Sequence, residues 1–205
     1  MAQSKPPSSS LQVEPVTTED IPALTDIIMD GFSTPHDRIM FPDTPGIREW
    51  WDNANRNDIL HKPDVKYVKV VDSYIPGSIL AYAKWDFNPK ERGHRFPPWH
   101  ADSDAKACSD FFEGCEVARK AIMHDRSHYY LDMLATHSSF RRRGAATMLL
   151  RWGCDQADQA ELPVYIDSSD DGVPVYERYG FYVVSGPRPT PEGISAMLRE
   201  PQTAA

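Results

Sequence analysis

Apolar and polar positions alternate along this chain in two periods, and these periods predict its helices and strands. Leu24, Ile27, Ile28 and Phe32 recur at helical spacing and predict a helix over residues 17–32. A capping-box-like start and a proline in the first turn mark where it begins. Further helices are predicted at residues 47–62, 105–123, 144–159 and 173–180.

Runs rich in β-branched and aromatic residues predict the strands. They lie at residues 11–16, 65–73, 78–87, 128–137, 163–169 and 181–186. A turn separates the second run from the third, which is typical of an antiparallel hairpin. From residue 128 onward, strands alternate with helices, and this implies a parallel strand pair. The pattern predicts an α/β fold of the α+β type, with a mixed, mostly antiparallel sheet flanked by helices.

The remaining segments set the domain boundaries. Residues 1–10 are polar and rich in Pro and Ser, and they predict a disordered lead-in. One domain is expected over residues 11–200. Residues 33–46 read as a turn-rich loop, and residues 88–104 form a long connection rich in Pro and charge.

Composition narrows the classes of function. The chain has 205 residues and a net charge of −8, which argues against a general nucleic-acid binder. Cys108, Cys115 and Cys154 include no close pair, so we expect reduced thiols and a cytoplasmic protein. The histidines and cysteines lack metal-ligand spacing, and no apolar run reaches the ~20 residues that span a bilayer. We therefore expect no metal and no membrane partner.

Three arginines followed by a glycine carry the strongest chemical signal. Arg141–Arg143 precede Gly144, where a strand and a short turn lead into a helix. A helix N-terminus offers unpaired N–H groups to an anion, and arginine adds forked donors for phosphate. The same residues would also be compatible with a solvent-exposed run of charge or with a nucleic-acid contact. The glycine-rich motifs of ATP, GTP and dinucleotide sites are absent.

The residues around the arginines resemble the GNAT superfamily of acetyl-CoA-dependent N-acetyltransferases. Arg141 to Ala146 follow its R/Q-x-x-G-x-G/A turn, and Tyr176 to Phe181 follow its Tyr-Glu-Lys-x-Gly-Phe motif, with a strand between them. The strong resemblance covers roughly residues 128–184, the expected CoA-binding half. It implies a single GNAT-like domain with splayed central parallel strands and acetyl-CoA as co-substrate.

The resemblance assigns the cofactor-binding positions. The pyrophosphate cradle would be formed, mostly by main chain, by Arg141, Arg142, Arg143, Gly144, Ala145, Ala146 and Thr147. In the preceding strand, backbone groups of Leu134, Ala135 and Thr136 would pair with pantetheine and polarise the thioester carbonyl. Ser168 would touch the pantetheine arm.

Two side chains are candidates for proton transfer. Tyr176 matches the tyrosine that protonates the leaving thiolate in the family, which is the role expected here, with a packed core aromatic as the alternative. Asp132 is the best base candidate from the residues themselves, because strand parity places it on the same face as Leu134 and Thr136. Glu113 and His137 are weaker alternatives.

The acceptor side is defined less sharply. In the family, the first helices and the loops before the central strand form the acceptor pocket, and here they carry Phe32, His36, Phe41, Trp50, Trp51, Trp85, Phe87, Trp99, Phe111 and Phe112. Most of these could simply fill the core. The long insertion at residues 88–125 favours a small-molecule amine acceptor. A peptide amine, and a non-catalytic CoA-binding module, are the alternatives. The oligomeric state, monomer or homodimer, is left open.

Overall fold

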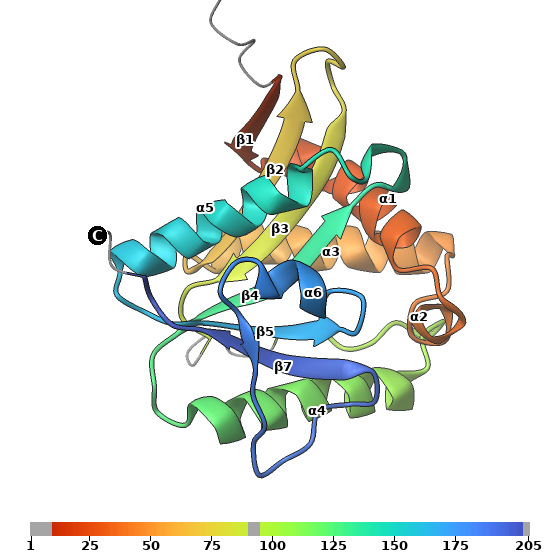
Figure 1. The fold of residues 1–205 in the computed structure, drawn as a ribbon. Coiled ribbons are helices and arrows are strands. Elements are labelled where there is room, and N and C mark those ends of the chain that lie inside the picture. The colour runs from red at the N-terminus through yellow and green to blue at the C-terminus, as the bar shows by residue number, and fades with distance from the viewer. Residues whose placement is uncertain (1–9, 90–94, 203–205) are drawn as a thin grey trace, which may run out of the picture.

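A computed structural model describes residues 10–89 and 95–202. Within these residues, seven strands form one mixed sheet in the order β1-β2-β3-β4-β5-β7-β6 (Figure 1). The strands are β1 (Leu11–Pro15), β2 (Val65–Asp72), β3 (Ile79–Asp86), β4 (Tyr129–Thr136), β5 (Val164–Ser169), β6 (Tyr182–Val183) and β7 (Ile194–Arg199). Neighbours are antiparallel except β4 and β5, which run parallel. The predicted fold class is confirmed.

Three of the helices begin at residues whose side chains satisfy a backbone N–H group of the first turn. The helices are α1 (Ile21–Gly31), α2 (Pro35–Met40), α3 (Pro45–His61), α4 (Ala105–Met123), α5 (Ala145–Gln159) and α6 (Val173–Glu177), with 3-10 turns η1 (Thr18–Asp20) and η2 (Ser138–Phe140). The side chains of Thr34, Thr44 and Asp104 accept hydrogen bonds from backbone N–H groups of α2, α3 and α4. Such N-caps fix where these three helices start.

Two elements differ from the sequence-based expectation. The expected loop at residues 33–46 contains α2, which begins at Thr34 and Pro35. β7 was not predicted, and it lies between β5 and β6, antiparallel to both. Residues 1–9 of the predicted lead-in and residues 90–94 of the predicted long connection lie outside the described residues.

Helices cover both faces of the sheet. α5 packs across β2, β3 and β4 on one face, where Leu149 and Leu150 are buried against Trp85 and Ile166. On the other face, α1 and α3 cover the first half of the sheet, and α4 runs along β4, β5 and β7 (Figure 1). We call these the α5 face and the α4 face.

The two parallel strands separate after three residue pairs. β4 and β5 are paired only from Tyr129↔Val164 to Leu131↔Ile166. The register between β3 and β4 shifts at the next residue of β4, Asp132, which has no opposite partner. An extra residue of this kind is a β-bulge, and it bends its strand away from its neighbour. The expected splay of the central parallel strands is therefore present and begins at the bulge.

Candidate active site

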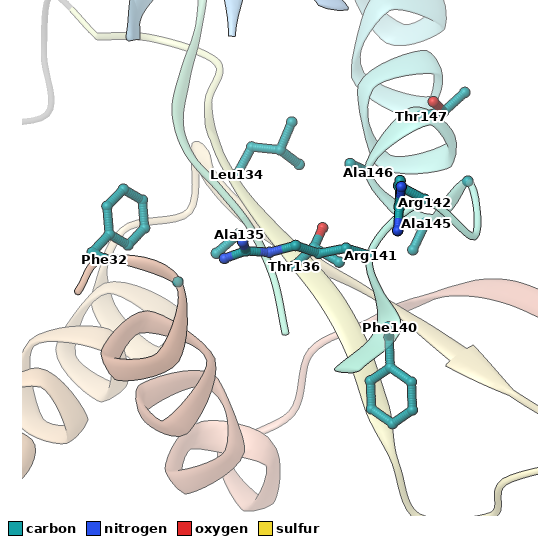
Figure 2. A pocket seen from close by; sticks show the side chains of 12 residues that line it. Phe32, Leu134, Ala135, Thr136, Phe140, Arg141, Arg142, Ala145, Ala146 and Thr147 are labelled. Carbon is teal, nitrogen blue, oxygen red and sulfur yellow. The ribbon is translucent and has the colours of Figure 1, made fainter. Parts of the chain in front are cut away.

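A cavity of about 390 Å³ opens where β4 ends and α5 begins. Its lining comes from the end of α1, the end of β4, η2 and the first turn of α5 (Figure 2). The lining residues are Gly31, Phe32, Leu134, Ala135, Thr136, Phe140, Arg141, Arg142, Gly144, Ala145, Ala146 and Thr147. Nine of these are residues that the sequence assigned to cofactor binding, so the fold brings most of the predicted set together.

The first turn of α5 presents backbone N–H groups to this cavity. Gly144 caps the helix at φ +90°, and the first helical hydrogen bond runs from the Met148 N–H to its carbonyl at 3.1 Å. The N–H groups of Ala145, Ala146 and Thr147 therefore precede the helical ladder, as at every helix start. A Cβ at Gly144 would have no neighbour within 4 Å, so the backbone is open to a ligand here. This geometry suits a phosphate group.

The three arginines of the turn lie in different surroundings. Arg141 extends across the cavity above Thr136 and Ala135 (Figure 2). Arg142 is exposed beside the first turn of α5 and adopts φ +60°. The Arg143 side chain lies outside the cavity lining, and its Nη2 binds Asp72 Oδ2 of β2 at 2.5 Å. Arg143 thus holds the turn against the sheet, whereas the other two face the cavity.

The opposite wall of the cavity is tied to the same turn. The Asp30 carboxylate of α1 accepts hydrogen bonds from the Ser138 N–H at 2.5 Å and from its hydroxyl at 2.8 Å. Although burial acts the other way, these bonds lower the pKa of Asp30. The end of α1, with Phe32 at the cavity rim, is thereby fixed to η2.

The end of β4 offers an unpaired backbone edge. Beyond Leu131, the described part of β5 forms no ladder with β4, whereas β3 continues to pair on the other side as far as Thr136. Leu134, Ala135 and Thr136 therefore line the cavity with main-chain groups free on the β5 side. Such a strand edge can pair with an extended ligand and polarise a carbonyl.

Tyr176 lies in α6, packed against the core on the α5 face. Its ring meets Phe181 edge-on, with 5.7 Å between centroids, and within the described chain its hydroxyl makes no hydrogen bond. Burial raises the pKa of Tyr176 to about 12, so the phenol keeps its proton at neutral pH. A Cβ at Gly172 would lie 3.0 Å from this ring, which shows how closely α6 packs.

Ser168 is close to the same glycine but is not part of the cavity lining. Its Oγ would lie 2.6 Å from a Cβ at Gly172. The side chain is buried, and the hydroxyl donates a hydrogen bond to the Ser169 carbonyl at 2.8 Å. That bond uses the hydroxyl proton of Ser168, the residue that was expected to touch the pantetheine arm.

The structure contradicts the facing that strand parity predicted for Asp132. Leu134 packs with the core of the α5 face, whereas the Asp132 carboxylate lies on the α4 face, where its Oδ2 is 3.0 Å from Lys84 Nζ and its Oδ1 contacts Arg95. The bulge at Asp132 reverses the alternation between these two positions. Asp132 is 3% exposed at its side chain, and two cations favour its charged form. It is poorly suited to accept a proton.

The expected acceptor aromatics divide into three groups. Phe32 lines the cavity. Trp85 lies under α5, and Phe87 stacks on Tyr129, so neither belongs to an acceptor pocket. The others lie on the α4 face, where His36 contacts Phe111. There the predicted aromatics, together with Phe96, which was not predicted, form one cluster that consists of Phe41, Trp50, Trp51, Phe96, Trp99, Phe111 and Phe112. Sequence reasoning missed Gly31, the last residue of α1, and Phe140 of η2, because both reach the cavity only through packing between distant parts of the chain.

Comparison with known proteins identifies the class. Residues 116–197 match the acetyltransferase (GNAT) domain family. No curated protein matches the chain by sequence. The fold resembles a histone acetyltransferase HPA2-related acetyltransferase from Corynebacterium glutamicum, with 22% identity, 95% of this chain and 98% of that chain covered, and a TM-score of 0.60.

Two further solved structures resemble the chain over most of its length. The PaiA N-acetyltransferase of Thermoplasma acidophilum in complex with coenzyme A has 11% identity, coverage of 93% and 98%, and a TM-score of 0.59. AAC(6')-Ib in complex with paromomycin and acetyl-CoA has 15% identity, coverage of 94% and 94%, and a TM-score of 0.55. At these identities the likeness establishes the fold.

Residues 116–197 therefore match a GNAT acetyltransferase domain, and the chain as a whole has the fold of the similar acetyltransferase structures. The family that this segment matches is one of acetyltransferases, and the similar PaiA structure contains coenzyme A. No helix in the described residues is long and apolar enough to cross a membrane.

Proposed function

We propose that this protein transfers an acetyl group from acetyl-CoA to the primary amine of a small molecule, by direct attack in a ternary complex. The observation that carries this proposal is the cavity shared by the first turn of α5 and the free edge of β4. One wall suits an anionic group and the other suits an extended amide chain that ends in a carbonyl. The cavity thus suits the pyrophosphate and the acetyl-pantetheine arm of the co-substrate.

The backbone supplies most of the chemistry in this proposal. Amide groups from Arg142 to Thr147 would hold the pyrophosphate, with Arg141 and Arg142 adding charge. A backbone N–H in the Leu134–Thr136 segment would stabilise negative charge on the thioester oxygen, a contribution on the order of 3 kcal/mol to the barrier. The bound thioester supplies the activated acyl group.

Tyr176 would supply the proton that the departing sulfur needs. Its pKa of about 12 keeps the phenol protonated, and its hydroxyl has no hydrogen-bond partner in the described chain. A thiol with a pKa near ~8.5 leaves more readily when a proton is available. Tyr179 packs in the core of the α5 face and is assigned no chemical role.

The cysteines favour direct transfer over an acyl-enzyme. Cys108, Cys115 and Cys154 are free and buried. Burial raises the pKa of the Cys108 thiol to about 11 and those of Cys115 and Cys154 to about 12. Nucleophilic cysteines need a lowered thiol pKa, so these three are poor candidates. Three free thiols also accord with a reducing, cytoplasmic location.

The insertion before β4 supports a small acceptor. The insertion contributes Trp99, and Phe111 and Phe112 of α4, to the aromatic cluster of the α4 face. It is held there by Trp50, which donates its indole N–H to the Pro98 carbonyl at 2.8 Å. This cover reduces the room for a long peptide beside β4. Among the similar folds, one acts on an alanine of ribosomal protein S18 and another holds paromomycin, so a peptide acceptor is the alternative.

A panel of acceptors tests the proposal. Purified protein is incubated with acetyl-CoA and either small primary amines or peptides with free N-terminal and lysine amines. Thiol release is followed, and the acetylated product is identified by mass spectrometry. We expect turnover with small amines. Turnover of peptides alone would contradict the small-molecule assignment, and acetyl-CoA binding without any turnover would indicate a non-catalytic module.

A further inference from the structure

A second carboxylate lies where β4 and β5 separate. Asp167 follows Ile166, which is the last residue of β5 that pairs with β4. It shares the α4 face with Tyr165, because the two residues are two apart in one strand. The residue as a whole is partly exposed. The sequence analysis did not single it out.

Hydroxyl groups, and not cations, bind the Asp167 carboxylate. Tyr130 of β4 donates to its Oδ2 at 2.8 Å, and Tyr165 donates to its Oδ1 at 3.1 Å. No ion pair of Asp167 occurs in the part of the chain that the structure describes. Asp132, in contrast, lies against both Lys84 and Arg95.

The groups around Asp167 come from four elements. Arg95 of the segment before α4 and Arg119 of α4 favour its charged form electrostatically, as do the two tyrosine hydroxyls. Cys115 of α4 also faces it. Burial outweighs these effects and raises the pKa of Asp167 above its ordinary value. Burial likewise raises the pKa of Tyr165.

We propose that Asp167, and not Asp132, accepts the proton that the attacking amine loses, in contact or through one water. This assignment rests on the proposed function. The amine nitrogen forms the new N–C bond with its lone pair while the C–S bond breaks toward sulfur. One proton passes from nitrogen to the Asp167 carboxylate, and one passes from Tyr176 to sulfur. Tyr130 positions the carboxylate through its hydrogen bond.

The test compares kcat/KM against pH for wild type, Asp167→Asn and Asp155→Asn at saturating acetyl-CoA. Asp155 is exposed on α5, away from the gap, and serves as the matched control. A base acts in its deprotonated form, so the wild-type rate should rise as pH increases through the pKa of Asp167. We expect Asp167→Asn to lose on the order of 10²-fold in rate, to lose this acidic limb and to keep its acetyl-CoA affinity.

Tyr130→Phe provides a second variant that keeps the carboxylate. Loss of a donor to the charged form should raise the pKa of Asp167 and move the acidic limb to higher pH. An unshifted limb in Tyr130→Phe, or an Asp167→Asn rate within threefold of wild type, would overturn the proton-acceptor assignment alone. Absence of amine turnover in wild type with acetyl-CoA bound would overturn the proposed function as well.

Discussion

Arg143 and Asp72 form an ion pair of 2.5 Å that ties the turn before α5 to the end of β2. The two residues are 71 positions apart, and the Asp72 side chain is fully covered. The third arginine of the motif is therefore an anchor for the cradle, while Arg141 and Arg142 face the cavity.

Loss of this anchor should weaken ligand binding indirectly. Arg143→Ala frees the turn that carries the α5 amides, so we expect acetyl-CoA to bind roughly fivefold more weakly. Arg56→Ala, at an exposed position of α3, is the charge-matched control and should bind normally. Isothermal titration of acetyl-CoA measures both. Equal affinity in the two variants would show that the turn holds its shape without Asp72.

Gly144 should matter for the ligand beyond its backbone conformation. Gly144 and Gly77 both have positive φ, +90° and +80°, and a Cβ at either would have no neighbour within 4 Å. Alanine at each should therefore cost about 1 kcal/mol of stability through backbone strain. We expect only Gly144→Ala to weaken acetyl-CoA binding, with Gly144→Glu abolishing it. If Gly77→Ala also bound acetyl-CoA more weakly, the loss of affinity in Gly144→Ala would be explained by reduced folding stability.

Tyr176→Phe should separate rate from binding. Removal of the hydroxyl leaves the ring against Phe181, so the fold and the acetyl-CoA affinity should change little. Turnover should fall on the order of 10²-fold if the phenol protonates sulfur. Tyr179→Phe, in the same short segment, is the control in steady-state assays. Wild-type turnover in Tyr176→Phe would remove it as the acid.

Asp132→Asn should act mainly on stability. The substitution leaves the buried Arg95 without this counter-charge, while Lys84 keeps its ion pair with Asp58, and breaking such a buried pair typically costs about 3–5 kcal/mol. Asp132 and Asp58 together hold the pKa of Lys84 above its ordinary value, against the effect of burial. Chemical denaturation measures the loss. An Asp132→Asn protein of wild-type stability with greatly reduced turnover would restore Asp132 as the base.

The sequence predicted what depends on local pattern. The helix start at Gly144, the strand before it and the anion-binding turn follow from neighbouring residues and from motif spacing. The splay of β4 and β5 was implied by the resemblance and is present.

The features that were missed depend on contacts far along the chain. The bulge at Asp132 is a mismatch in pairing with β3, so counting positions within β4 alone gave the wrong face. The partner of Arg143 lies in β2, and β7 enters the sheet between β5 and β6 from the end of the chain. The hydrogen bond between Tyr130 of β4 and Asp167 of β5 likewise depends on the pairing of two strands, so the sequence alone did not indicate it.

Two-substrate kinetics tests the central claim, direct transfer at the cavity between β4 and α5, most directly. Initial rates of thiol release are measured across a matrix of acetyl-CoA and primary-amine concentrations, and the intact mass of the protein is recorded after incubation with acetyl-CoA alone. The account predicts intersecting reciprocal plots and a protein that carries no acetyl group. Parallel plots, together with an acetylated protein that passes its acetyl group to the amine, would contradict it.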